Sequence, residues 1–180
     1  MQGWRQVTIG DLCDTISITY HRNDDAVVLV NTSDVLEGKI LNHKSVKNEN
    51  LKGQFKKTFR MNDILYSEIR PANKRFAFVD FEDTSHYIAS TKLMVLRPRT
   101  EMVLPQFLFA ILKSESMLIE LQHLAETRSG TFPQITFNTE LAPIKVMLPD
   151  LETQRLIVDF LNSIEGKIEI NNNINDNLVA

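Results

Sequence analysis

The sequence predicts an α+β protein: a domain built on a mixed, twisted β-sheet with packed helices, followed by a long C-terminal helix of the coiled-coil type. Three observations predict this class. Short runs rich in β-branched and aromatic residues recur through the first half of the chain, as in strands. An amphipathic region of about twenty residues follows, as in helices. The end of the chain then carries apolar residues at alternating steps of four and three, the spacing of a helix that packs along a partner helix.

The elements of the domain follow from local signals. Thr8 precedes a short stretch that it is expected to cap as a helix with its hydroxyl. The amphipathic region begins at Pro105, a residue tolerated in a first helical turn, and is expected to divide into two helices near Ser114. Polar loops are expected at 68–75 and 127–134. Strands are expected where short apolar runs lie between turn residues, at 27–30, 55–59, 64–67, 75–81, 92–97 and 144–148.

The terminal helix is expected to run from residue 150 to residue 178. Pro149 fits only at the start of a helix, and Asp150 and Glu152 place negative charge at its positive end. The helix would be roughly 43 Å long, more than the core of such a chain needs, although a helix folded back on its own domain is the other interpretation. Two asparagines in its seam can fix the register of paired helices; the seam is Ile157, Leu161, Ile164, Ile168, Asn171, Asn175 and Leu178.

Composition indicates one globular domain with an appendage. The 180 residues are 43% hydrophobic and 24% charged, without a signature of disorder. Cys13 is the single cysteine, so no disulfide framework exists and a reducing compartment is expected. The longest apolar run, 107–112, is too short to cross a bilayer, and the start shows no signal-peptide pattern. We therefore expect a cytoplasmic protein with no membrane segment.

Charge is unevenly distributed, although the net charge is only −3. Residues 149–180 contain six acidic and two basic residues and carry −4, so residues 1–148 carry +1. Residues 39–75 contain ten lysines and arginines against three acidic residues, a local charge of +7. Such a block is a candidate footprint for phosphate groups, and it is equally what a solvated face of an ordinary domain would show. Charge alone leaves both interpretations open.

The motifs of common enzyme classes are missing. The sequence has no glycine-rich loop for nucleotides, and its four histidines are scattered without the spacing of a zinc site. A metal-dependent nuclease would place an acidic residue and a Glu-x-Lys pair around a metal ion. Glu37 and Lys39 form a Glu-x-Lys motif shortly after Asp34, but Asp34 is too close in sequence to come from a separate strand. We expect no catalytic residue, no metal and no cofactor, and interpret the chain as a reader rather than a catalyst.

Several short motifs lie in order over nearly the whole chain: Gly3-Trp4, Gly10-Asp11-Leu12, Asn31-Thr32-Ser33-Asp34, Gly38-Lys39-Ile40, Asn62-Asp63-Ile64-Leu65-Tyr66-Ser67, Arg70-Pro71, Ser90-Thr91-Lys92, Val95-Leu96-Arg97-Pro98, Gly130-Thr131-Phe132-Pro133-Gln134-Ile135, and Leu148-Pro149 with Gln154 and Ile157. In order and spacing these motifs resemble the specificity subunit of type I restriction-modification systems. The resemblance is to one half of that subunit, a target recognition domain at 1–148 followed by a conserved helical region at 149–180. The family usually carries two of each, so this sequence departs from it in length: it is either a natural half-subunit or a piece of a longer one.

The resemblance implies a non-catalytic subunit that reads one half of a bipartite site in double-stranded DNA. Its helical region would space the two halves and dock methyltransferase subunits and, through them, the restriction subunit. Methylation of adenine and cleavage of DNA would reside in those subunits. Modifying a base requires flipping it from the stack, and this sequence has no motif for a flipped adenine or a methyl donor. The seam of the terminal helix predicts a homodimer, which would bring two recognition domains together.

Residue types suited to DNA contacts gather in the basic block and in the two loops. Arginine and lysine favour guanine, asparagine and glutamine favour adenine, and lysines suit phosphates. The DNA target itself does not follow from the sequence. Two alternatives remain, a protein-interaction module that dimerises through its helix and a nuclease that uses Asp34, Glu37 and Lys39. The candidate DNA contacts are Lys52, Lys56, Lys57, Arg60, Arg70, Asn73, Lys74, Arg75, Arg128 and Gln134.

Overall fold

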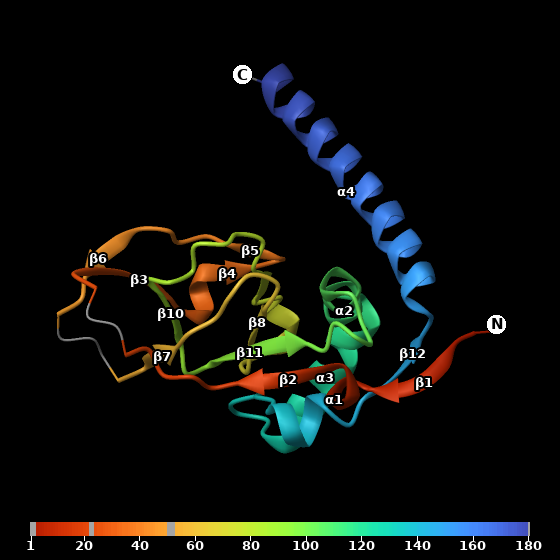
Figure 1. Cartoon of the computed structure of the whole chain (residues 1–180), viewed down its shortest axis with the longest axis horizontal. Helices are drawn as coiled ribbons and strands as arrows, with labels where there is room; N and C mark the ends of the chain where they lie inside the picture. Colours follow the sequence, from red (N-terminus) through yellow and green to blue (C-terminus); the bar gives the residue numbers. More distant parts are fainter. Residues whose placement is uncertain (1–2, 22–23, 50–52, 180) are drawn as a thin grey trace.

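The computed structural model describes residues 3–21, 24–49 and 53–179, and Figure 1 shows how they are arranged. A long helix, α4 (Leu151–Val179), leaves a domain of short strands and helices. The described helices and turns of that domain are α1 (Ile9–Leu12), α2 (Pro105–Leu112), α3 (Glu115–Arg128), the 3-10 turns η1 (Thr32–Asp34) and η2 (Pro71–Asn73), and the π-helical turn η3 (Phe137–Leu141). The described strands are β1 (Arg5–Thr8), β2 (Cys13–Ile16), β3 (Ala26–Val30), β4 (Val35–Leu36), β5 (Lys39–Ile40), β6 (Ser45–Lys47), β7 (Phe55–Lys57), β8 (Ile64–Ser67), β9 (Phe76–Phe78), β10 (Tyr87–Ser90), β11 (Leu93–Pro98) and β12 (Lys145–Leu148).

Two four-stranded sheets form the middle of the domain. One has the strand order β6-β3-β10-β7, in which β3 and β10 are parallel and the other neighbours are antiparallel. The other has the order β2-β11-β8-β9 and is antiparallel throughout. In addition, β4 pairs with β5 as a hairpin, and β1 pairs with β12 from the far end of the domain. The predicted α+β class with a mixed sheet is confirmed, with the strands divided between separate sheets.

The central strands are apolar on both faces because each face covers a different part of the core. Side chains alternate between the faces of a strand. In β8, Ile64 and Tyr66 join the cluster beneath the helices, whereas Leu65 joins the cluster between the two sheets. In β11, Met94 packs toward the helices and Val95 toward the first sheet. The double coverage explains why these strands read as apolar runs rather than as alternating patterns.

The predicted starts of the domain's helices are confirmed by their caps. Thr8 caps α1: the backbone N of Asp11 donates to Thr8 Oγ1 (3.3 Å), and Asp11 Oδ2 accepts from the backbone N of Thr8 (2.8 Å). Pro105 is the first residue of α2. Ser114 separates α2 from α3, and its Oγ accepts from the backbone N of Met117 (3.3 Å). These contacts satisfy donors that the start of a helix otherwise leaves unpaired.

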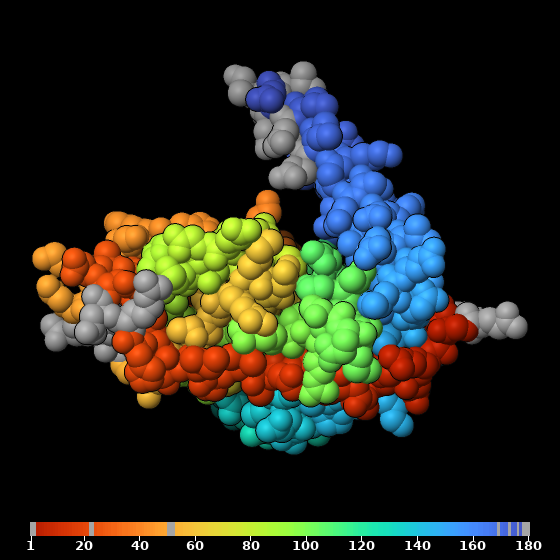
Figure 2. All heavy atoms as spheres, in the orientation of Figure 1, coloured from red at the N-terminus to blue at the C-terminus, as the bar shows by residue number. Residues whose placement is uncertain are grey.

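Helix α4 is fixed to the domain by a fully buried glutamine, Gln154. Its Oε1 accepts from the backbone N of Leu104 (2.9 Å), and its Nε2 donates to the carbonyls of Pro149 (2.9 Å) and Met102 (3.1 Å). Val158, one turn further, is also buried, and α2 packs against α4. Beyond this root the helix extends away from the domain (Figures 1 and 2). No helix in the described ranges, α4 included, has both the length and the apolar character to span a membrane.

Several short strands were not predicted from the sequence. β1, β2, the hairpin β4–β5 and β6 are only two to four residues long, so none of them carries a readable period. β10 was missed as well, although all of its residues are buried. The predicted strand at 75–81 forms over Phe76–Phe78 alone. Pairing with distant partners, rather than local propensity, fixes these elements.

We expect Gln154→Leu to lower the free energy of unfolding by about 2–4 kcal/mol. The apolar replacement leaves one backbone N–H and two carbonyls without their partners. Only the bond to Pro149 is fully buried, so water can partly replace the other two, and a group left buried without a partner costs about 1–3 kcal/mol. Chemical denaturation followed by circular dichroism measures the difference.

The matched control is Gln106→Leu, which replaces an exposed glutamine of α2 and should change the free energy of unfolding by less than about 0.5 kcal/mol. Equal stabilities of the two variants would contradict the role given to Gln154.

Candidate nucleic-acid interface

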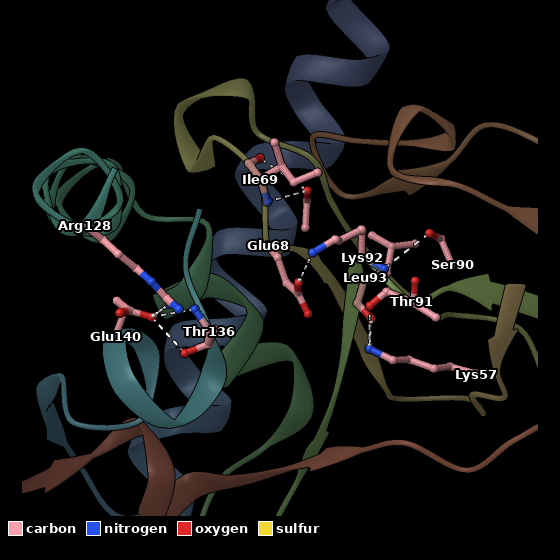
Figure 3. Close-up of polar contacts among 11 residues, drawn as sticks. Lys57, Glu68, Ile69, Ser90, Thr91, Lys92, Leu93, Arg128, Thr136 and Glu140 are labelled. Atoms are coloured by element: carbon pink, nitrogen blue, oxygen red, sulfur yellow. Dashed lines mark hydrogen bonds and ion pairs between the residues drawn. The ribbon is translucent and has the colours of Figure 1, made fainter. Parts of the chain in front are cut away.

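The two loops that the sequence predicted for DNA contacts, 68–75 and 127–134, lie side by side and are called the paired loops below. The backbone N of Arg70 donates to the carbonyl of Pro133 (3.0 Å), and the backbone N of Ile135 donates to the carbonyl of Glu68 (2.8 Å). A β-bridge between Ile69 and Gln134 lies between these two bonds. Segments far apart in the sequence therefore lie against each other, and Figure 3 labels Glu68 and Ile69 of the first loop and Arg128 of the second.

The turn η2, which forms the tip of the first loop, is held in a conformation that is rare for its residues. Arg70 and Lys74 flank it with φ of 45° and 53°, in the left-handed region that side chains with a Cβ disfavour. Buried Pro71 and a hydrogen bond from the backbone N of Ala72 to Gln122 Oε1 (3.1 Å) on α3 hold the turn in place. Strain of this kind is retained where the surroundings fix the backbone, and it is frequent at binding sites.

Four of the predicted DNA contacts are exposed and unengaged. The side chains of Arg70 and Asn73 stand on the turn η2, while Lys56 lies in β7 and Arg60 just before β8. Within the described part of the chain, no hydrogen bond or ion pair engages any of these four side chains. They can therefore contact a ligand without first breaking an internal interaction.

Lys57, in contrast, is used inside the domain (Figure 3). Its Nζ donates to the carbonyls of Thr91 (2.9 Å) and Leu93 (2.8 Å), between β7 and the turn before β11. Burial lowers the pKa of Lys57, while the nearby carboxylate of Glu68 raises it and the cation of Lys92 lowers it further. The geometry favours a structural role for Lys57 over the predicted phosphate contact.

Arg128 is engaged in a similar way at the second loop (Figure 3). Its Nη1 donates to the buried carboxylate of Glu140 (3.0 Å), which also accepts from the backbone N (2.6 Å) and Oγ1 (2.9 Å) of Thr136. These hydrogen bonds to Glu140 connect the end of α3 to η3 and so hold the loop between them in place. The bonds favour Arg128 as a support of the loop rather than as a reader of bases.

Lys74 and Arg75 connect the paired loops to the segment 33–37. Lys74 Nζ forms an ion pair with Glu37 Oε1 (3.0 Å), and Arg75 Nη1 donates to the carbonyl of Ser33 (3.0 Å). Glu37 is thereby engaged, and Asp34 Oδ2 accepts from the backbone N of Asn31 (2.8 Å) in a cap. Among the described residues, no group of three or more His, Cys, Asp or Glu side chains could hold a metal ion.

The remaining predicted contacts and two residues missed by the sequence reasoning complete the surface. Gln134 is half-buried, and Lys52 lies outside the described residues. Lys92 adds an exposed cation beside the first loop, in an ion pair with Glu68 (3.4 Å), but it falls outside the basic block of the sequence. Gln122 supports η2, yet a glutamine on a helix gives no sequence signal of such a role. Whether any of these residues touches DNA stays a prediction.

The seam predicted on α4 is divided between two surroundings. Ile157 and Leu161 are half-buried, and Ile157 packs against the core of the domain. Ile164 and Ile168 are 39% and 53% exposed, and Asn171 and Asn175 are exposed as well. The side chain of Leu178 lies outside the described ones. Exposed apolar residues of α4 that the seam did not include are Leu151, Leu156, Phe160, Ile170 and Ile174, of which Leu156 (66%) and Phe160 (64%) are the most exposed.

The comparison with protein families matches the whole chain to one family. Residues 1–180 match the family model described as the type I restriction modification DNA specificity domain. The specificity subunit of the type I restriction enzyme HindI from Haemophilus influenzae is 43% identical over 179 residues. The alignment covers 99% of this chain and 39% of that relative, so this chain spans well under half of the length of the relative.

Solved structures share the fold. The HsdS subunit from Thermoanaerobacter tengcongensis has a TM-score of 0.80 at 26% identity, over 97% of this chain and 45% of that one. A chain from a structure concerning complex assembly and conformational transition of the type I R-M system has a TM-score of 0.79, with the same identity and coverage. A family model that matches from end to end, together with a relative at 43% identity, confirms what the sequence motifs predicted: this chain belongs to the family of type I restriction modification DNA specificity domains.

Proposed function

We propose that this chain is the DNA-reading half of a type I restriction-modification specificity subunit, whose domain reads one half of a bipartite site in double-stranded DNA. The observation that carries the proposal is the pair of loops joined by backbone hydrogen bonds, on which Arg70 and Asn73 are exposed and unengaged within the described chain. Membership of the family and the local charge of +7 over residues 39–75 support it.

The exposed side chains suit two kinds of DNA contact, to bases and to phosphates. The guanidinium of Arg70 can donate two bonds to one guanine, and the amide of Asn73 can both donate to and accept from one adenine. Lys56 and Arg60 suit phosphate oxygens, which position the protein without specifying sequence. Because η2 is held by Pro71 and Gln122, its backbone loses little freedom on binding, and only the side chains of Arg70 and Asn73 have to be ordered.

Residues 1–148 are proposed as the recognition domain and residues 149–180 as a helical spacer. In this arrangement α4 docks methyltransferase subunits and, through them, the restriction subunit, and the chemistry on DNA resides in those partners. The chain itself transfers no methyl group and cleaves no DNA. Access to host DNA places the complex in the cytoplasm.

Two copies of the chain are further proposed to pair through α4. Beyond its root that helix presents apolar side chains to water, with Phe160 at 64%, Ile164 at 39% and Ile168 at 53% exposure. Burying an aliphatic side chain stabilises an assembly by about 1.5–3 kcal/mol, so several per copy can offset the entropic cost of association. A two-fold dimer would hold two recognition domains at a fixed separation and would bind an inverted repeat.

Base reading by Arg70 can be tested once a preferred sequence is selected from a random duplex pool. Arg70→Ala should weaken binding to the selected duplex by about 1–3 kcal/mol and leave binding to a scrambled duplex nearly unchanged. Lys56→Ala should weaken both duplexes alike and lower the slope of log affinity against log salt by about 0.9, because one phosphate contact is lost. Mobility-shift titrations at several salt concentrations give both quantities.

Arg5→Ala, which removes an exposed arginine of β1, is the matched control and should bind like the wild type. If Arg70→Ala matches this control on both duplexes, the base-reading surface lies elsewhere. A wild-type chain that binds no duplex even at low salt would favour the alternative, a non-catalytic protein-interaction module that dimerises through its helix.

Pairing through α4 predicts that Ile164→Asp combined with Ile168→Asp yields monomers, because two carboxylates would be buried in the seam. The domain should stay folded, since its core lies upstream of both positions. Sedimentation equilibrium reports the association, and circular dichroism the fold.

Asn162→Asp is the control, since it adds a carboxylate roughly 160° around the helix from Ile164 at about 100° per residue. A wild-type chain that remains monomeric at high micromolar concentration, with or without DNA, would show that α4 serves a different subunit.

A further inference from the structure

Helix α3 and turn η2 border a shallow, open hollow of about 390 Å³ with a mainly apolar lining. Leu118 is buried in it, whereas Ile119 beside it is 65% exposed. Both belong to α3. The hollow has room for an aliphatic side chain, and its exposed apolar surface would be removed from water when a partner covers it.

The rim of the hollow is negative. Glu115 and Glu126, both exposed, lie on the same face of α3 as Ile119, one on each side of it along the helix. The cation on the opposite wall, Lys74, is already paired with Glu37 (3.0 Å). Carboxylates repel phosphate, so this surface does not suit the DNA backbone, and they attract a partner that carries basic side chains.

The hollow lies directly behind the turn proposed to read DNA. Gln122 Oε1 accepts from the backbone N of Ala72 in η2 (3.1 Å), and Gln122 Nε2 donates to Glu126 Oε1 on the rim (2.7 Å). One amide thus joins the carboxylate that would meet a partner to the backbone that presents Arg70 and Asn73. A protein seated in the hollow would lie beside DNA held by the paired loops.

We infer that this hollow docks a protein segment of a partner subunit, one that presents an aliphatic side chain between two lysines or arginines. The aliphatic side chain would contact Leu118 and Ile119, and the flanking cations would meet Glu115 and Glu126. A helix that lies along α3 provides this arrangement, because residues three and four apart share one face. The inference rests on the proposed function, in which the partner works on the same DNA, and the hollow contains no residue of α4.

The test measures binding of the full chain to the purified modification subunit of the same restriction-modification system by calorimetry, and DNA binding separately by mobility shift. Ile119→Asp should weaken binding of the modification subunit roughly tenfold or more, as expected for a central apolar anchor. Glu115→Lys should weaken it too, most at low salt, because the lost attraction is electrostatic. Both variants should bind DNA and melt like the wild type. The control Met147→Asp, at a residue 46% exposed on β12, should change neither binding reaction.

The outcomes separate this inference from the proposed function. Wild-type affinity of Ile119→Asp for the modification subunit overturns the inference, as does a wild-type chain that binds DNA but not that subunit. Loss of DNA binding by a normally melting Ile119→Asp also overturns it, since the hollow would then belong to the DNA surface. If sedimentation shows that Ile119→Asp abolishes self-association, the occupant is a second copy and the inference is wrong. Failure of the wild-type chain to bind any duplex contradicts the proposed function instead.

Discussion

Gln154 lies fully buried where α4 begins, and its side-chain amide bonds to three backbone groups, the N–H of Leu104 and the carbonyls of Met102 and Pro149. A primary amide accepts on one side and donates on the other, so these bonds fix the direction of α4 as well as its position. The length of the helix makes this important. Over roughly 43 Å, a tilt of about 5° at the root would move the far end by roughly 4 Å. The position of the far end of α4 relative to the domain therefore depends on a few hydrogen bonds at residue 154.

The charged residues of the domain serve two purposes that their sequence positions do not distinguish. Lys57, Arg75 and Arg128 donate to carbonyls or to a buried carboxylate and so hold loops in place. Arg70 and Lys56 are exposed and unengaged within the described chain. Such a division lets the exposed side chains change without disturbing those that support the loops. A domain of this kind can alter what it reads while keeping its fold.

Much of the fold could be predicted from the sequence, because the relevant signals are local. The cap at Thr8, the break at Ser114 and the start of α4 after Pro149 depend on residues within one helical turn, and each lies where it was predicted. The short strands could not be predicted, since their pairing partners are distant; β1, for example, pairs with β12.

For the candidate site, too, local features could be predicted from the sequence and contacts between distant residues could not. The sequence identified the two loops but not which cations are engaged, because the partners of Lys57 and Arg128 lie on other elements. For the same reason the apolar seam of α4 could not be divided in advance between the domain and the solvent. Ile157 packs against a core that only the folded chain assembles.

The pairing of β1 with β12 brings Arg5 opposite Leu148, so the polypeptide enters and leaves the globular part at one place. A segment whose two ends are neighbours can be exchanged for another of the same build without shifting what precedes or follows it. In a longer chain built from such segments and helices, one domain could therefore be replaced by another while the distance between the elements on either side of it stays the same.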